Sequence, residues 1–176
     1  MKMEYKRRWL AFAVMLSCAS TLPTENLVRR ISGGDRKGSF MRRDLANEDM
    51  EERQIGDDVH RFIRSEPCGC VQCHVVEMRG VDINNRNYSH RLTWIHSDIW
   101  RQVEVHYYDQ RNKHIKTARY GGFQLIDGIW SKTRAVIEML STRSRTVLTW
   151  QQIQYNVGLA DALFEHTELK QSGDGK

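Results

Sequence analysis

From residue 57 onward, strand-like runs of hydrophobic and polar residues alternate with turn signals, and several of the runs have a period of two. In residues 101–108, Val103, Val105 and Tyr107 fall on one face, and polar residues fall on the other. Successive side chains of a β-strand point to opposite faces of a sheet, so this pattern predicts a half-buried strand. Similar runs predict strands at residues 59–65, 71–79, 91–96, 101–108, 113–120, 123–126, 129–130, 133–139 and 145–155.

Turn signals separate these runs at nearly regular intervals. The clearest is Asp127-Gly128, because the tight turn of a hairpin needs positive φ angles that glycine adopts without steric cost. Only two short helices are predicted, at residues 47–54 and 160–164. A parallel sheet needs crossover helices that this pattern lacks. The sequence therefore predicts a mainly β fold, an antiparallel meander with one or two short helices.

A sheet with one apolar face has to bury that face, and the chain offers few helices to cover it. The sheet therefore closes on itself or curls around a lipidic ligand or a partner. If the face of residues 101–108 and 133–139 is the concave one, its apolar residues line a cavity for that ligand. These candidate lining residues are Val103, Val105, Tyr107, Ile137 and Met139.

Composition and charge narrow the classes of protein. The chain has 176 residues, enough for one domain, and no apolar run approaches the roughly 18–20 residues of a membrane-spanning helix. Residues 1–43 carry ten basic and three acidic residues. Their net charge of +7 exceeds the net charge of +5 of the whole chain. The body is therefore slightly acidic, which argues against a nucleic-acid-binding domain.

The first twenty residues have the order of a secretory signal. Met1–Arg8 is basic, residues 9–16 are apolar, and residues 17–20 are small. We therefore predict that residues 1–20 are a signal peptide or an unrelated leader. A functional signal would place the body in the periplasm or cell envelope of a bacterium.

Several strings of residues, taken in order, resemble the outer-membrane lipoprotein-sorting-like (LolA-like) family. They cover most of the chain, and their ordered succession carries the resemblance. The strings are residues 22–40, 44–49, 107–109, 128–130, 145–148 and 155–164.

The resemblance implies a strongly curved antiparallel sheet, a half-open barrel around an apolar cavity. It predicts a single LolA-like β domain at residues 21–170, truncated because the family has a longer amino-terminal portion, with a disordered tail at residues 171–176. It also implies a non-enzymatic protein without a cofactor that binds lipid or lipoprotein acyl chains. Such a protein is peripheral to the membrane and could exchange cargo with an envelope transporter.

The sharpest chemical motif is Cys68-Gly-Cys70-Val-Gln-Cys73-His74. The spacing Cys70-x-x-Cys73-His74 matches that of covalent haem attachment, and the four side chains could also bind zinc. In an oxidising compartment Cys73 could instead form a disulfide with Cys68 or Cys70, on condition that the strand bulges. An exported haem or metal-binding protein is therefore the alternative function.

The remaining candidates favour structural roles. No catalytic motif of a hydrolase, kinase or nucleotide-binding enzyme occurs in the sequence. Tryptophans recur in or beside the predicted strands, and we interpret them as packing residues rather than a ligand site. They are Trp94, Trp100, Trp130 and Trp150.

Overall fold

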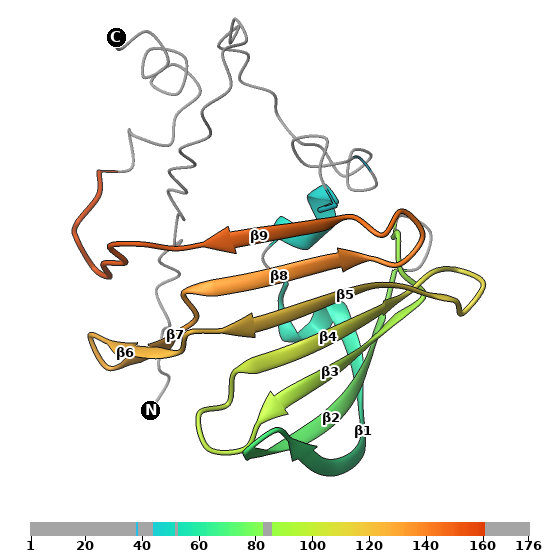
Figure 1. Ribbon diagram of the computed structural model, residues 1–176, viewed down its shortest axis with the longest axis horizontal. Helices are drawn as coiled ribbons and strands as arrows, with labels where there is room; N and C mark the ends of the chain where they lie inside the picture. Colours follow the sequence, from blue (N-terminus) through green and yellow to red (C-terminus); the bar gives the residue numbers. More distant parts are fainter. Residues whose placement is uncertain (1–37, 39–43, 52, 83–85, 161–176) are drawn as a thin grey trace, which may run out of the picture.

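The computed structural model describes Gly38 and residues 44–51, 53–82 and 86–160. Seven strands form one antiparallel sheet in the order β1-β2-β3-β4-β5-β8-β9, which twists and curves strongly from one edge to the other (Figure 1). A two-stranded hairpin, β6 and β7, lies between β5 and β8 in the sequence. The strands of the sheet are β1 (Asp58–Cys68), β2 (Val71–Gly80), β3 (His90–His96), β4 (Gln102–Tyr108), β5 (His114–Gly121), β8 (Arg134–Met139) and β9 (Arg145–Thr149).

The predicted mainly β meander is confirmed. Consecutive strands of the sheet pair in antiparallel register, and β1 and β9 are its two edges within the described part of the chain. The predicted hairpin also forms, with β6 (Gln124–Ile126) paired to β7 (Ile129–Ser131). Its turn places Asp127 at φ 50° and Gly128 at φ 77°, the positive values that a tight hairpin requires.

Two predicted elements were wrong, and a third is not described. In place of the helix predicted at residues 47–54, a 3₁₀ turn η3 covers only Asn47–Met50, and a second 3₁₀ turn, η4 (Ile55–Asp57), follows the predicted span. The strand predicted at residues 145–155 ends at Thr149, because Gln152 takes a positive φ of 53° that an extended strand does not allow. Most of the helix predicted at residues 160–164 lies outside the described residues.

One face of the sheet carries the core. Paired positions bring the row Thr93, Val105, Ala118 and Ile137 onto this face, and these side chains are nearly fully buried. Leu45, which precedes η3, packs on the row together with the two rings Tyr88 and Tyr107. Partly buried residues extend the core towards one end of the sheet: Ile115, Tyr120, Leu148 and Trp150.

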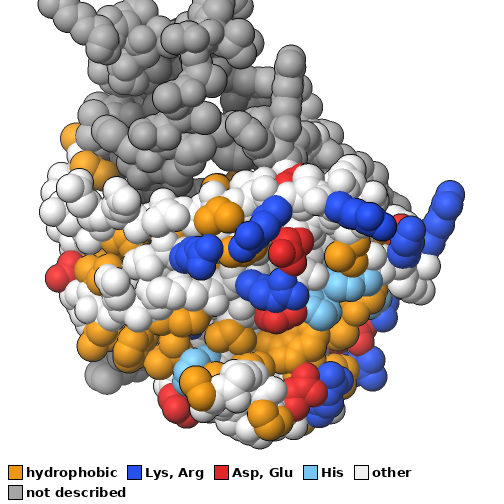
Figure 2. All heavy atoms as spheres, viewed as in Figure 1, with side chains coloured by type: hydrophobic (Ala, Val, Ile, Leu, Met, Phe, Trp, Pro, Cys, Tyr) orange, Lys and Arg blue, Asp and Glu red, His pale blue; other side chains and the backbone are white. Residues whose placement is uncertain are grey.

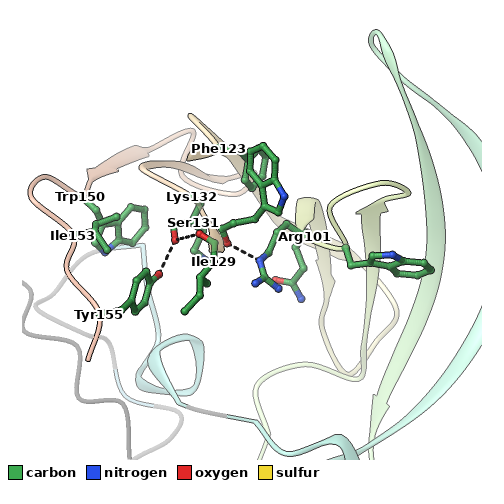
Figure 3. A pocket seen from close by; sticks show the side chains of 11 residues that line it. Arg101, Phe123, Ile129, Ser131, Lys132, Trp150, Ile153 and Tyr155 are labelled. Carbon is green, nitrogen blue, oxygen red and sulfur yellow. Dashed lines mark hydrogen bonds between the residues drawn. The ribbon is translucent and has the colours of Figure 1, made fainter. Parts of the chain in front are cut away.

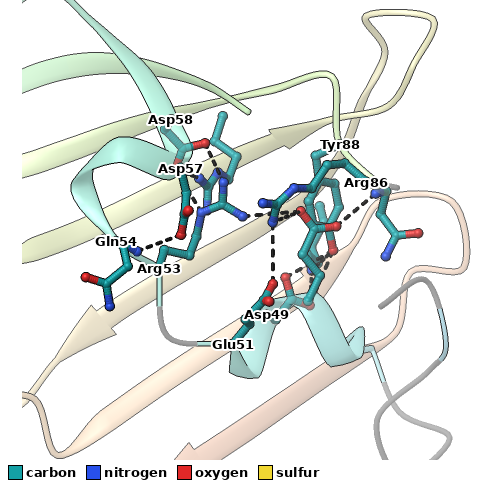
Figure 4. Close-up of polar contacts among 12 residues, drawn as sticks. Asp49, Glu51, Arg53, Gln54, Asp57, Asp58, Arg86 and Tyr88 are labelled. Carbon is teal, nitrogen blue, oxygen red and sulfur yellow. Dashed lines mark hydrogen bonds and ion pairs between the residues drawn. The ribbon is translucent and has the colours of Figure 1, made fainter. Parts of the chain in front are cut away.

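A polar network fastens the segment before β1 onto this inner face (Figure 4). The Arg53 guanidinium donates to both Asp58 carboxylate oxygens, and Arg91 of β3 donates to the same carboxylate at 2.7 Å. Glu48 accepts a bond from the backbone N–H of Asn87 at 2.8 Å. These contacts hold η3 and η4 on the inner face, although the turns themselves are too short to be stable alone.

The opposite, outer face carries charge pairs across the strands. Arg119 of β5 contacts Glu104 of β4 at 3.4 Å and Glu138 of β8 at 2.6 Å. Figure 2 shows basic, acidic and histidine side chains next to one another over the middle of this face, with hydrophobic side chains around them. The outer face also buries apolar side chains, because Val75 and Cys73 of β2 share the face of Trp94 and are fully buried. The sheet therefore has its main core on one side and a mixed apolar and charged surface on the other.

Within the described residues, no helix has the length and hydrophobicity needed to cross a membrane.

Candidate ligand-binding site

A pocket of about 340 Å³ lies at the end of the sheet where the β6–β7 hairpin joins it (Figure 3). One wall comes from the hairpin and the residues beside it, the second from the segment that follows β9, and the third from the start of β4. Most lining side chains are apolar or aromatic. They are Trp100, Arg101, Gln102, Phe123, Ile129, Trp130, Ser131, Lys132, Trp150, Ile153 and Tyr155.

The hairpin is held against the sheet by a close approach between Gly122 and Thr133. Gly122 has φ 63°, and its carbonyl accepts a bond from the Thr133 hydroxyl at 2.8 Å. A Cβ atom at residue 122 would lie well under 3.0 Å from that hydroxyl, so only glycine fits without movement. This joint sets where Phe123 and the residues of β7 face the pocket.

The segment after β9 folds over the pocket instead of continuing the sheet. Its first residue, Trp150, is fixed by a backbone bond from its N–H to the carbonyl of Thr133 at 2.9 Å. At Gln152 the chain turns through positive φ, and Tyr155 then reaches Ser131 of β7. The two hydroxyl oxygens are 2.7 Å apart, and Ser131 Oγ also donates to the carbonyl of Ile129.

Trp100 stands at the third wall in an unusual backbone conformation. Its φ is 53°, in the left-handed region that bulky side chains avoid, and 66% of its surface is exposed. Such strain costs on the order of 1–3 kcal/mol and is concentrated at functional sites of proteins. An exposed indole held at this cost is therefore a candidate contact for a ligand.

Two cations border the pocket, and no Asp or Glu among the residues that the structure describes lines it. The ammonium of Lys132 lies 3.9 Å from the ring centroid of Tyr120 and 5.7 Å from that of Trp150. Lys132 is exposed overall, but the loss of water around its nitrogen lowers its pKa. The Arg101 guanidinium donates through Nε to the carbonyl of Trp130 at 2.7 Å. The arrangement can hold a slender apolar group beside positive charge.

The five lining residues predicted from the sequence lie on the inner face, and none of them is among the residues that line this pocket. Val105, Tyr107 and Ile137 are buried in the core under Leu45, whereas Val103 and Met139 are half-buried. They share the face from which Trp150 and Tyr120 extend the core to the pocket wall.

The cysteine motif is divided between the two faces of the sheet. Cys68 and Cys73 form a disulfide, which leaves Cys70 as a free, exposed thiol in the turn between β1 and β2. The disulfide does not need a bulge beside it: the register shift of β1 lies between Phe62 and Arg64, β1 and β2 stay in register from Arg64 to Cys68, and Cys68 and Cys73 are diagonal neighbours on one face. His74 points to the other face, where its Nδ1 meets the hydroxyl of Ser65 at 2.9 Å.

This arrangement does not support the haem or metal alternative. Covalent haem attachment needs both Cys70 and Cys73 as thiols, and Cys73 is in the disulfide with Cys68. In the described part of the chain, no three side chains among His, Cys, Asp and Glu gather in a way that could hold a metal ion.

The pocket itself was missed from the sequence. Three tryptophans interpreted as packing residues, Trp100, Trp130 and Trp150, line it, whereas Trp94 contacts His106 and Glu66 on the outer face. The available signal was the pairing of an indole with a nearby cation, at Trp100-Arg101 and again at residues 130–132. Period-two analysis does not detect it, because the pairing lies at strand ends and turns.

Comparisons with known proteins agree with this architecture. Over 84% of the chain, the fold superposes with a TM-score of 0.78 and 34% identity on a DUF1329 family protein from Desulfovibrio piger. A protein from Vibrio parahaemolyticus that is described as an outer membrane lipoprotein-sorting protein domain superposes with a TM-score of 0.78 and 25% identity over 85% of the chain. A LolA superfamily protein from Nitrosomonas europaea superposes with a TM-score of 0.63 and 24% identity over 84% of the chain.

The chain spans 62%, 63% and 65% of the lengths of these three proteins. No curated protein sequence matches it. The predicted resemblance to the LolA-like proteins is thereby confirmed. A family model described as "-like: Uncharacterized protein" matches residues 21–171, most of the chain, and the chain belongs to that family.

Proposed function

We propose that this protein is a non-enzymatic carrier of the cell envelope, which binds lipid or the acyl chain of a lipoprotein in the pocket on the inner face of its curved sheet. The observation that carries the proposal is the pocket of about 340 Å³ lined by Trp100, Trp130 and Trp150. That volume falls within the range of about 300–1,000 Å³ that small-molecule sites occupy. The likeness to lipoprotein-sorting proteins supports the same reading.

The energetics of such a site require no catalytic group. Each CH₂ group that leaves water contributes about 0.8 kcal/mol, so a short stretch of acyl chain gives measurable affinity. Aromatic side chains suit this role because they offer a large apolar surface with little conformational entropy to lose. The exposed indole of Trp100 would lose water when the chain enters, which adds to the gain.

Binding of a neutral fluorescent probe such as N-phenyl-1-naphthylamine, and its displacement by a monoacylglycerol, tests this proposal. We expect Trp100→Ala and Trp130→Ala each to weaken probe binding about tenfold, or roughly 1.4 kcal/mol. Val147→Ala is the control, because Val147 is an exposed residue on the outer face, away from the pocket. Native mass spectrometry of protein purified from membranes would detect bound lipid directly. If the protein takes up no probe and no lipid co-purifies with it, the proposal is contradicted.

The row of Val103, Val105, Tyr107, Ile137 and Met139 is proposed as the continuation of the same cavity. A chain longer than the pocket has to displace Leu45 to reach the buried members of this row. Acyl ligands of increasing length separate the two cases. Affinity that keeps rising with each CH₂ indicates use of the row, whereas a plateau at short length restricts binding to the pocket.

Location and partners follow from this function as further proposals. We place the protein in the periplasm or envelope, peripheral to the membrane, with acyl chains as cargo and an envelope transporter as the donor or acceptor. Fractionation of cells that express the full chain tests the location. Recovery of the protein in the cytoplasm alone would contradict it.

A further inference from the structure

The ammonium of Lys132 has an unusual set of neighbours for a cation beside aromatic walls. Two rings contact it, those of Tyr120 and Trp150. Among the described residues, none forms a hydrogen bond or an ion pair with it. Two other cations of the sheet differ, since Lys116 contacts Asp49 and Arg91 contacts Asp58. Lys132 is therefore a charge without a counter-charge within the part of the chain that the structure describes.

Arg101 adds a second positive charge to the same pocket. Its Nε is used in the bond to the carbonyl of Trp130, but the described residues give its guanidinium no carboxylate partner. Figure 3 shows Arg101 on one side of the pocket and Tyr155 with Trp150 on the other, with Lys132 and Ser131 between them. Because no acidic residue of the described ranges lines the pocket, both charges favour an anion inside it.

The hydroxyl groups of the pocket are already engaged. Ser131 donates to the carbonyl of Ile129, so Tyr155 donates to Ser131 across the 2.7 Å contact. Neither proton remains free for a neutral polar group of a ligand. The remaining donors of the lining, the Gln102 amide and the indole N–H groups, are uncharged, whereas the two cations prefer a carboxylate or a phosphate to an uncharged oxygen.

We propose that the pocket selects anionic amphiphiles, with the ammonium of Lys132, assisted by Arg101, binding a carboxylate or phosphate while the apolar chain lies among the tryptophans. This inference rests on the proposed acyl-binding function and names the class of ligand. It also explains the low pKa of Lys132, because the partly desolvated amine lacks the anion that would stabilise its charge.

Displacement of the neutral probe by ligands with one chain length tests the inference. We expect decanoate and decyl phosphate to displace it at concentrations about tenfold lower than decanol does, and decyltrimethylammonium to be the weakest. Comparison of the carboxylate with the phosphate distinguishes a fatty acid from a phospholipid head as the natural source. Lys132→Met should remove the preference for anions, and Lys132→Arg should retain it.

Lys113→Met is the matched control, because Lys113 is an exposed lysine in the turn between β4 and β5. It should leave the preference unchanged. Equal displacement by decanol and decanoate in the unmodified protein, or a preference that survives in Lys132→Met, would overturn this inference and leave acyl binding intact. Failure of the probe and of every ligand to bind would refute the proposed function itself. Thermal unfolding of each variant verifies that it is folded.

Discussion

Lys116 of β5 shows how a single charged residue is accommodated in the core of the sheet. Only 2% of its side chain is exposed, and its ammonium lies 2.5 Å from Asp49 Oδ2. It also contacts the Tyr88 hydroxyl and lies 4.2 Å from the centre of the Tyr107 ring. Burial lowers the pKa of Lys116, and the nearby carboxylate of Asp49 opposes that shift. The pair joins η3 to the sheet at one point.

Removal of one partner of this pair should be costly. Asp49→Asn leaves a buried ammonium without its counter-charge, and we expect the free energy of unfolding to fall by about 3–5 kcal/mol. The double variant Asp49→Asn with Lys116→Met should recover much of this loss, because no uncompensated charge remains. Urea denaturation measures both. Glu138→Gln is the control, since its exposed ion pairs contribute only about 0–1 kcal/mol. Equal effects of the two carboxylate changes would contradict this account.

At the scale of elements, the β6–β7 hairpin decides whether a pocket exists. The hairpin leaves the sheet after β5 and returns at β8, and Gly122 and Thr133 close its base. Its own turn, Asp127-Gly128, is formed by local sequence alone. The base of the hairpin is not formed by local sequence, because it depends on the contact between Gly122 and Thr133, which are eleven positions apart.

Two glycines with similar φ values allow the base to be tested against the turn. Gly122→Ala and Gly128→Ala both place a side chain in the left-handed region, which costs about 1–2 kcal/mol. Only Gly122 is crowded, because no atom lies within 4 Å of a Cβ at Gly128. We therefore expect Gly122→Ala to lower the melting temperature more and to weaken probe binding, while Gly128→Ala leaves binding unchanged. Equal losses of binding would show that the base does not position the pocket.

At the scale of the whole molecule, a ladder of rings crosses the outer face from β3 to β5. His106 stacks on His114 at 4.4 Å between centroids, and His90 stacks on Tyr108 at 4.3 Å. Tyr108 and His114, 5.2 Å apart, connect the two pairs. Burial lowers the pKa of His90 and of His114, assisted by Arg79 and by His106 respectively.

The ladder predicts loss of stability in mild acid. Because the folded state lowers the pKa of His90 and His114, the unfolded chain takes up protons first as pH falls through about 6.5. The free energy of unfolding should therefore decrease between pH 7.5 and pH 5.5. Asp58 and Glu77 also have lowered pKa values, but these affect stability only as pH falls below about 4.5.

Urea denaturation at the two pH values measures this effect. The double variant His90→Asn with His114→Asn should show a smaller decrease than the unmodified protein. His60→Gln, which changes an exposed histidine of β1, should keep the full decrease. An unchanged pH dependence in the double variant would show that other groups cause it.

Features that depend on interactions between near neighbours in the sequence were predicted correctly, and features that depend on contacts between distant residues were not. The strand of Val103, Val105 and Tyr107 and the turn at Asp127-Gly128 were predictable, because alternation and turn chemistry act between near neighbours. The end of β9 at Thr149 was not, because the apolar pattern continues past it to Tyr155. Contacts of Trp150 and Tyr155 with distant residues override that pattern there.

The sequence by itself determined the meander, its apolar face and the family likeness, since these depend on local periodicity and on the order of residues along the chain. The tertiary structure alone decided which of three cysteines pair, where the segment of η3 lies, and that Trp100, Lys132 and Tyr155 meet around one pocket. The physical reason is the curvature of the sheet, which brings strand ends and turns from β4, β7 and the residues after β9 into contact. No pattern confined to one segment encodes such a meeting.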